Sequence, residues 1–316
     1  MESAPPAAPA RPSPRAPVEA VRADATVEAL RAEPPVEALR AELRGVRAAL
    51  EARRARDERL LQVELQAYED RLLASPRHQE PGRLARFGHQ MFSQHGEDGI
   101  LAEIFRRIGV VDRTCVEIGI GNGLENNTAA LLVQGWRGFW VEGDVRQATR
   151  ASRTFAGAIA DGRLAMARAT VTAENVEAVL SALAVPAGVD LLSLDIDRNT
   201  YWVWRAITSV RPRVVVVEYN AQFPPGVDWV VAYRADRAWN GTAWFGASLS
   251  ACERLGREKG YALVGCSLTG VNAFFVREDL CGQHFAAPFT AAHHFEPARY
   301  YLNRRTGHPA SAGDGA

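Results

Sequence analysis

The chain has 316 residues, of which 47% are apolar and 23% charged, as expected for a soluble globular protein with one α/β domain and an appendage. Its 37 basic residues equal its 37 acidic residues in number, so charge gives no support for a nucleic-acid or membrane partner. The N-terminus has no apolar leader, the four cysteines form no Cys-x-x-Cys pair, and no apolar run reaches the ~18 residues of a membrane helix, which together predict a cytoplasmic protein with reduced thiols.

The first 35 residues are rich in proline and alanine. Six prolines lie among the first 17 residues, which predicts disorder because such a composition cannot bury a core. A nine-residue near-repeat follows, with copies that begin at Val18, Val27 and Val36. The pair Pro34-Pro35 stops any continuous helix before the last copy.

Residues 36–75 are predicted to form a helical arm, because alanine, leucine, arginine and glutamate dominate and proline is absent until Pro76. The apolar residues are spaced as in a coiled coil, at Val36, Leu39, Leu43, Val46 and Leu50, and after Arg54 and Asp57 the spacing resumes at Leu61, Leu65, Tyr68 and Leu72. Two interpretations remain open. The arm is either a coiled coil that forms a homodimer or recruits a partner, or a solvated helix that packs on the domain.

From residue 87 to 285 the pattern changes to alternating helices and strands. Continuous apolar strands between helices predict a Rossmann-like, doubly wound α/β sheet that is covered on both faces and ends in an antiparallel hairpin. The predicted helix covers 100–108, and the predicted strands cover 114–118, 138–141, 191–194, 214–217, 261–266 and 272–276. Residues 286–316 are predicted to be a C-terminal tail.

A glycine loop follows the first predicted strand, with the sequence EIGIGNG from Glu117 to Gly123. Glycines let the backbone turn sharply and approach a ligand closely. The dinucleotide fingerprint fails because Leu124 stands where its third glycine belongs. The pattern instead resembles motif I of class I methyltransferases, which implies that Glu117, Gly119, Gly121 and Gly123 bind S-adenosylmethionine. A structural tight turn is the alternative.

The next predicted strand ends in Glu142-Gly143-Asp144, about 20 residues past the loop. An acid at this point can accept hydrogen bonds from both hydroxyls of a ribose. We assign this role to Glu142, whereas Asp144 is an alternative that can instead cap the following helix.

Two further stretches resemble FkbM-type methyltransferases: SQHGED at residues 93–98, and GWRG at residues 135–138. This resemblance covers roughly residues 87–285. It implies the class I methyltransferase fold, S-adenosylmethionine as cofactor, and O-methylation of a sugar, polysaccharide or natural-product hydroxyl. Those proteins often carry Lys-Ile-Asp-x-Glu-Gly at the fourth strand, where this chain has Leu194-Asp195-Ile196-Asp197-Arg198-Asn199. The resemblance therefore does not supply the catalytic residues.

Polar side chains follow two neighbouring predicted strands: Asp195 and Asp197 on one, Glu218 and Asn220 on the next. Ligands of open α/β sheets bind beyond the carboxyl ends of strands, so these residues should border one crevice. The first interpretation is that Asp197 or Glu218 is a general base, while Asp195 contacts the cofactor. The second is helix capping. The third is an Mg²⁺ site, disfavoured because the Asp-Asn pair of catechol O-methyltransferase-like enzymes is absent.

Four other residues each have a functional interpretation and a structural one. His95 is either a base or part of the methionine pocket, or else a solvated residue at a helix start. Asn126 and Asn127 either contact acceptor or cofactor, or cap a helix. Trp202 either forms the floor of a sugar site or packs in the core.

The sequence therefore predicts a methyltransferase that acts on a small-molecule or glycan acceptor, with no nucleic-acid or membrane partner and no metal among the assigned ligands. A nucleotide-dependent oxidoreductase is the alternative enzyme. A coiled-coil scaffold with a degenerate methyltransferase domain is the non-enzyme alternative.

Overall fold

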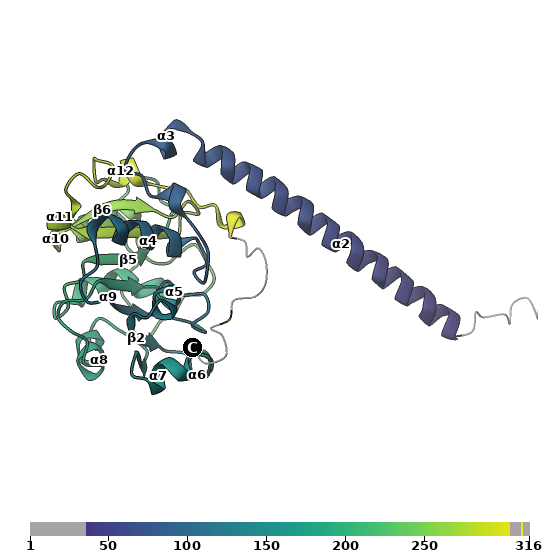
Figure 1. Cartoon of the computed structure of the whole chain (residues 1–316), viewed down its shortest axis with the longest axis horizontal. Coiled ribbons are helices and arrows are strands. Elements are labelled where there is room, and N and C mark those ends of the chain that lie inside the picture. The colour runs from purple at the N-terminus through teal and green to yellow at the C-terminus, as the bar shows by residue number, and fades with distance from the viewer. Residues whose placement is uncertain (1–35, 304–310, 312–316) are drawn as a thin grey trace, which may run out of the picture. The chain divides into compact units, whose positions relative to one another are not determined.

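The computed structural model describes residues 36–303 and residue 311 (Figure 1). The predicted disorder of residues 1–35 thus lies outside the described residues, as does most of the chain after residue 303. The strands are β1 (Thr114–Ile118), β2 (Arg137–Glu142), β3 (Leu164–Arg168), β4 (Leu191–Leu194), β5 (Val214–Glu218), β6 (Tyr261–Cys266) and β7 (Asn272–Arg277). The α-helices are α2 (Val36–Leu73), α3 (Pro76–Gln79), α4 (Glu97–Ile108), α5 (Ala129–Val133), α6 (Val145–Thr154), α7 (Ala156–Ala160), α8 (Val176–Ala182), α9 (Thr200–Ala206), α10 (Leu249–Glu258), α11 (Glu278–Cys281) and α12 (Ala291–His294).

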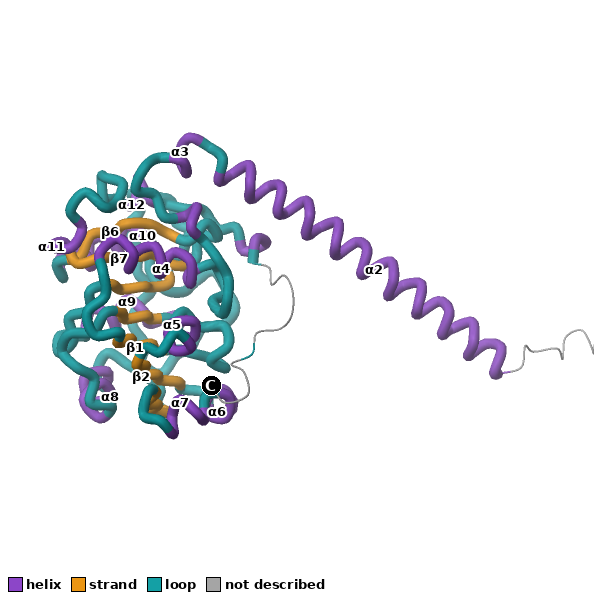
Figure 2. The backbone as a smooth tube through the Cα atoms, in the orientation of Figure 1, coloured by secondary structure: helices purple, strands orange, loops and turns teal. Residues whose placement is uncertain are grey.

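The seven strands form one sheet in the order β3-β2-β1-β4-β5-β7-β6 (Figure 2). The first five are parallel, whereas β7 runs antiparallel between β5 and β6. This order, with its antiparallel final hairpin, confirms the predicted Rossmann-like sheet of class I methyltransferases. The order reverses beside β1 and β4, which is the place where open α/β sheets bind ligands.

Helices cover both faces of the sheet, which is why its central strands are mostly apolar and almost entirely buried. On one face α4 packs through Ile100, Leu101 and Ile104 onto alternate strand residues such as Leu191 and Val214. The other alternate residues face α8, α9 and α10. β1 and β4 are buried at every position, as expected for parallel strands between two helical layers.

One strand was absent from the sequence prediction. β3 lies at the sheet edge, and after its first residue Leu164 it is only partly buried. Its sequence Leu-Ala-Met-Ala-Arg has neither the continuous apolar run nor the β-branched residues that mark the buried strands. An edge strand needs neither feature, because one of its sides is open.

The compact domain extends beyond the predicted limits of 87 and 285. The chain divides into one unit up to Leu61 and a second from Gln62 onward. Arg83 donates from Nη1 to the carbonyl oxygen of His293 at 2.6 Å, and His78 is buried beside Glu296. Residues predicted as arm or tail therefore belong to the fold. Residues that join the fold through polar contacts do not form an apolar pattern in the sequence, so pattern analysis does not find them.

The two halves of α2 differ in their surroundings. Leu65, Tyr68 and Leu72 are partly buried against Leu268 and Leu302 of the domain, which supports the packed-helix interpretation for the C-terminal half. The five apolar positions of the first half, from Val36 to Leu50, are 49–65% exposed. The helix as a whole contains no fully buried residue. The first half thus carries an apolar seam of exposed residues.

Two features of composition have structural counterparts. All four cysteines are buried and free of disulfide bonds, in agreement with the prediction of reduced thiols. Among the described helices, none combines the length and the apolar character that crossing a membrane requires.

Candidate functional site

The glycine loop after β1 is shaped by two close approaches. Gly119 has a φ of +90°, and a Cβ atom there would lie 1.7 Å from the carbonyl oxygen of Asp195. Gly121 has a φ of +55° but faces open space, with no atom within 4 Å of a Cβ placed on it. Gly123 instead packs against Trp140 and Phe155 in the core. The loop thus presents Gly119 and Gly121 to a ligand, whereas Gly123 supports it from behind.

Glu142, at the end of β2, is hydrogen-bonded to this loop. One carboxylate oxygen accepts from the Gly121 amide and the other from the Asp144 amide, both at 2.7 Å. Each oxygen keeps a second lone pair for a ligand hydroxyl. Asp144 caps α6 by accepting from the amides of Arg146 and Gln147, so the alternative predicted for this residue is the one observed.

Two cavities lie at this edge of the sheet, and Gly119, Gly121 and Asp195 line both of them. The larger is about 670 Å³ and the smaller about 230 Å³. The larger cavity is further lined by Ile118, Val141, Glu142, Gly143, Asp144, Ala169, Thr170, Val171, Ile196, Asp197, Asn199 and residues 235–238. Their combined size suits a nucleotide-sized ligand with a small extension.

The smaller cavity is lined by hydrogen-bond acceptors. Glu97 is fully buried and accepts from the Asn272 side chain and from the His95 amide, both at 2.8 Å. The Oδ1 atoms of Asn126 and Asn272 are buried and have no partner among the described residues. Asp195 adds a carboxylate, and no lysine or arginine of the described chain lines this cavity. It therefore suits a cationic group that donates hydrogen bonds.

His95 also lines this smaller cavity, away from the Asp197 side of the site. Burial lowers the pKa of its imidazole, although the neighbouring Glu97 raises it. Its Nδ1 atom is buried without a partner in the described structure. This placement favours the predicted contact with a ligand in the smaller cavity over the predicted role as a base.

Glu117 lies beneath the smaller cavity and is 1% exposed. Its carboxylate accepts hydrogen bonds from Asn126, Asn127, Thr128 and Ser193, including two backbone amides. Burial raises the pKa of this carboxyl, while the Thr128 hydroxyl and the other donors oppose that shift. Since its oxygens already accept these hydrogen bonds, Glu117 holds the segment after the glycine loop at the wall of the smaller cavity, and its predicted contact with a cofactor stays a prediction.

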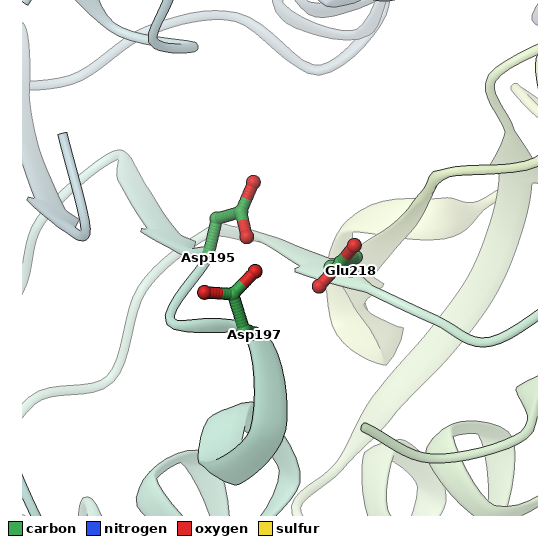
Figure 3. A group of neighbouring side chains, drawn as sticks. All are labelled: Asp195, Asp197 and Glu218. Atoms are coloured by element: carbon green, nitrogen blue, oxygen red, sulfur yellow. The ribbon is translucent and has the colours of Figure 1, made fainter. Parts of the chain in front are cut away.

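Three acids converge at the ends of β4 and β5: Asp195, Asp197 and Glu218 (Figure 3). One carboxylate oxygen of each acid lies within 4.8 Å of the corresponding oxygens of the other two. Burial raises the pKa of Asp195 to about 7, with the Asp197 charge as the next cause. Burial and the Asp195 charge raise the pKa of Glu218 well above its usual range. The trio therefore retains its protons to higher pH than exposed carboxyl groups do, and it is also the set of oxygen ligands that a divalent cation would use.

Asp197 is the most exposed of the three acids and lines the larger cavity. Burial and the charge of Glu142 raise its pKa. Its φ of +55° is uncommon for a residue other than glycine, and such conformations cluster at functional sites. Asp197 is thus an accessible carboxylate with a raised pKa next to the cavity.

The acid trio predicts a pH-dependent stability. An acid with a raised folded-state pKa keeps its proton in the folded protein after the unfolded chain has lost it, so stability falls as pH rises above about 4.5. Glu218→Gln should therefore melt higher than the wild type at pH 8, by roughly 3 °C or more, and similarly to it near pH 4.5. The equivalent change at the exposed Glu51 serves as control. Equal differences at both pH values in a thermal-shift assay would contradict this picture.

Two predicted substrate-binding residues do not reach either cavity. Trp202 donates from its indole N–H to the Val231 carbonyl at 2.8 Å and packs between Tyr201 and Tyr233. Asn220 is fully buried and donates to the carbonyls of Ala243 and Phe245. These side chains anchor the long loop between β5 and α10, and their predicted contact with a substrate stays a prediction. Asn126 and Asn127 do line the smaller cavity.

Three groups at the site were missed by the sequence analysis. Glu97 lies in the SQHGED stretch, which the sequence singles out, but nothing in that stretch indicates that Glu97 lines a ligand cavity. Asn272 lies on β7, 175 residues away, and nothing in its local sequence marks it. Residues 235–238 of the β5–α10 loop line the larger cavity. The tryptophans of this loop are the feature of the sequence that could have indicated a binding role for it.

No protein-family model and no curated protein matches the chain. Among solved structures, a candidate caffeoyl-CoA O-methyltransferase from Staphylococcus aureus aligns at 12% identity over 56% of this chain and 81% of that chain, with a TM-score of 0.39. A SAM-dependent methyltransferase from Aquifex aeolicus aligns at 10% identity over 56% and 88%, with a TM-score of 0.34. The O-methyltransferase NcsB1 from neocarzinostatin biosynthesis aligns at 18% identity over 55% and 51%, with a TM-score of 0.33. The strand order described above establishes the fold class independently of these similarities.

Proposed function

We propose that the protein is an S-adenosylmethionine-dependent O-methyltransferase. The observation that carries this proposal is the pairing of Glu142 with the Gly121 amide at the rim of the larger cavity, at the reversal point of the sheet. Open space at Gly121 leaves room for a ligand against the backbone. A carboxylate at this position suits the two hydroxyls of a ribose.

The cofactor also fits the smaller cavity. The methionine end of S-adenosylmethionine carries an ammonium group, which donates hydrogen bonds and bears a positive charge. Asp195 and the unpartnered Oδ1 atoms of Asn126 and Asn272 are acceptors suited to that group. The residues present therefore fit both ends of the cofactor, with Glu142 at one end and these acceptors at the other.

The cofactor supplies an electrophilic methyl group on a sulfonium. The protein's part is to align an acceptor hydroxyl with that methyl group and to take up its proton. We assign the proton to the carboxylate of Asp197, with Glu218 as the alternative base. A raised pKa places Asp197 nearer the pH at which a general base is most effective.

The acceptor is proposed to be a sugar, polysaccharide or natural-product hydroxyl, following the resemblance to FkbM-type methyltransferases. The β5–α10 loop supports an acceptor with a flat or ring-shaped face. Trp239 directly follows the cavity-lining residues 235–238 and is 46% exposed. An exposed indole beside the site can stack on an aromatic ring or on the apolar face of a sugar.

Calorimetric titration with S-adenosylmethionine tests the cofactor assignment. Glu142→Ala should weaken binding by roughly 1–3 kcal/mol, because the ribose hydroxyls lose their acceptor. Asp161→Ala is the matched control, since this exposed acid lines neither cavity. Unchanged affinity in Glu142→Ala, or binding of NAD in place of S-adenosylmethionine, would overturn the assignment in favour of a different cofactor class.

A further inference from the structure

The helix α2 carries an apolar seam whose residues are exposed over the first half of the helix. Leu39, Leu43, Val46 and Leu50 are each about half exposed or more. Helical stability in proteins comes mostly from packing an apolar face, and exposed seams of this length normally have a partner. The spacing and the charge of α2 indicate which partner.

The seam of α2 is symmetric about the midpoint between Ala55 and Arg56. From Leu39 toward the midpoint, successive seam residues are four, three, four and four residues apart, and the last of them is Arg54. Read inward from Leu72, the intervals are the same and end at Asp57. Two antiparallel copies centred on that midpoint therefore place every seam residue opposite another: Leu39 on Leu72, Leu43 on Tyr68, Val46 on Leu65, Leu50 on Leu61 and Arg54 on Asp57.

The charges of α2 favour the same orientation. Residues 36–56 contain six arginines and three glutamates, a net charge of +3, whereas residues 57–73 contain two arginines and five acids, a net charge of −3. An antiparallel pair places the basic half of each helix on the acidic half of the other. A parallel pair would place the two basic halves side by side and the two acidic halves side by side, with Arg54 facing Arg54 and Asp57 facing Asp57. Like charges at facing positions are destabilising.

We propose that α2 is an antiparallel homodimer interface in which Arg54 of each copy pairs with Asp57 of the other at the centre. Within the chain these side chains make only exposed pairs, Arg54 with Glu58 at 3.5 Å and Asp57 with Arg53 at 3.8 Å. Such surface pairs contribute little and are easily exchanged. Leu65, Tyr68 and Leu72 also contact the domain, while Leu60 and Leu61 remain more than half exposed and leave apolar surface for the second copy. This inference does not depend on the reaction that the domain catalyses.

Charge reversal of the full-length protein tests the proposal by light scattering and sedimentation. The wild type should be a dimer, and Arg54→Asp or Asp57→Arg alone should weaken dimerisation by roughly tenfold or more, since each turns two attractive pairs into repulsive ones. The double variant should recover the wild-type affinity. Arg44→Asp, the same charge change one residue past the seam position Leu43, should have a much smaller effect. A monomeric wild type, or a double variant as weak as the singles, would overturn the proposal.

Cysteine cross-linking provides an independent test of orientation. Mixed Leu50→Cys and Leu61→Cys proteins should form a disulfide-linked dimer on oxidation, whereas neither variant should cross-link alone. The four native cysteines are buried, so they should not interfere. Efficient self-cross-linking of Leu50→Cys would instead establish a parallel pair.

Discussion

Replacing Gly119 with alanine is expected to reduce cofactor affinity by more than about 100-fold. The added Cβ would lie 1.7 Å from the carbonyl oxygen of Asp195, where no methyl group fits. The clash is with backbone, so no side-chain rotation can relieve it. The C-terminal ends of β1 and β4 would have to separate, and both cavities are built on those two ends. The positive φ adds about 1–2 kcal/mol of strain for any residue with a Cβ.

Gly162→Ala is the matched control for this substitution. Gly162 has a φ of +76°, so alanine there meets the same conformational strain, but no atom lies within 4 Å of the added Cβ. It also lines neither cavity. Calorimetry should therefore show near-normal binding in Gly162→Ala and affinity lowered by more than about 100-fold in Gly119→Ala. Circular dichroism separates a lost site from a lost fold, and wild-type affinity in Gly119→Ala would show that the loop does not hold the cofactor.

The elements that the sequence predicted best are those buried on both faces. The predicted strands 114–118, 191–194 and 261–266 coincide with β1, β4 and β6, because each is mostly apolar and is buried at every position. β3 was missed because it is only partly buried, so its residues need not be large or β-branched. Arg77, His78 and Arg83 contact residues 293–296 through polar groups, and such contacts leave no apolar pattern in the sequence.

In the site, too, the residues that could be predicted are those marked by the local sequence, and the residues that were missed meet only in the folded chain. Glu142, Asp195 and Asp197 could be placed because strand ends are visible in the sequence and the carboxyl ends of parallel strands share one edge. Glu97 and Asn272 meet only in the folded chain, so their shared cavity could not be predicted. Trp202 and Asn220 also follow strand ends, but the β5–α10 loop folds back over them and engages their hydrogen-bonding groups.

Substituting Asp197 with asparagine is expected to slow methyl transfer by about 10²- to 10⁴-fold, the usual cost of losing a general base. The change keeps the size of the side chain and removes the carboxylate. Cofactor affinity should change little, because the contacts assigned to the cofactor lie on Glu142, Asp195 and the smaller cavity. Single-turnover kinetics with a saturating cofactor, alongside calorimetry, measures the two effects separately.

The neighbouring acids determine how this result is interpreted. The three carboxylates lie within 4.8 Å, so a proton lost from one site can be taken up by another, and the trio acts as a unit. Normal turnover in Asp197→Asn with an inactive Glu218→Gln would move the base to β5. A third outcome is loss of activity in a chelator and recovery with magnesium, in which case the trio holds a cation and its carboxylates orient the acceptor through the metal. Recovery with magnesium distinguishes the third case from the first two, because activity should rise with pH both when a general base loses its proton and when metal ligands lose theirs. If Asp197 is the base, Asp197→Asn should remove this rise along with the rate.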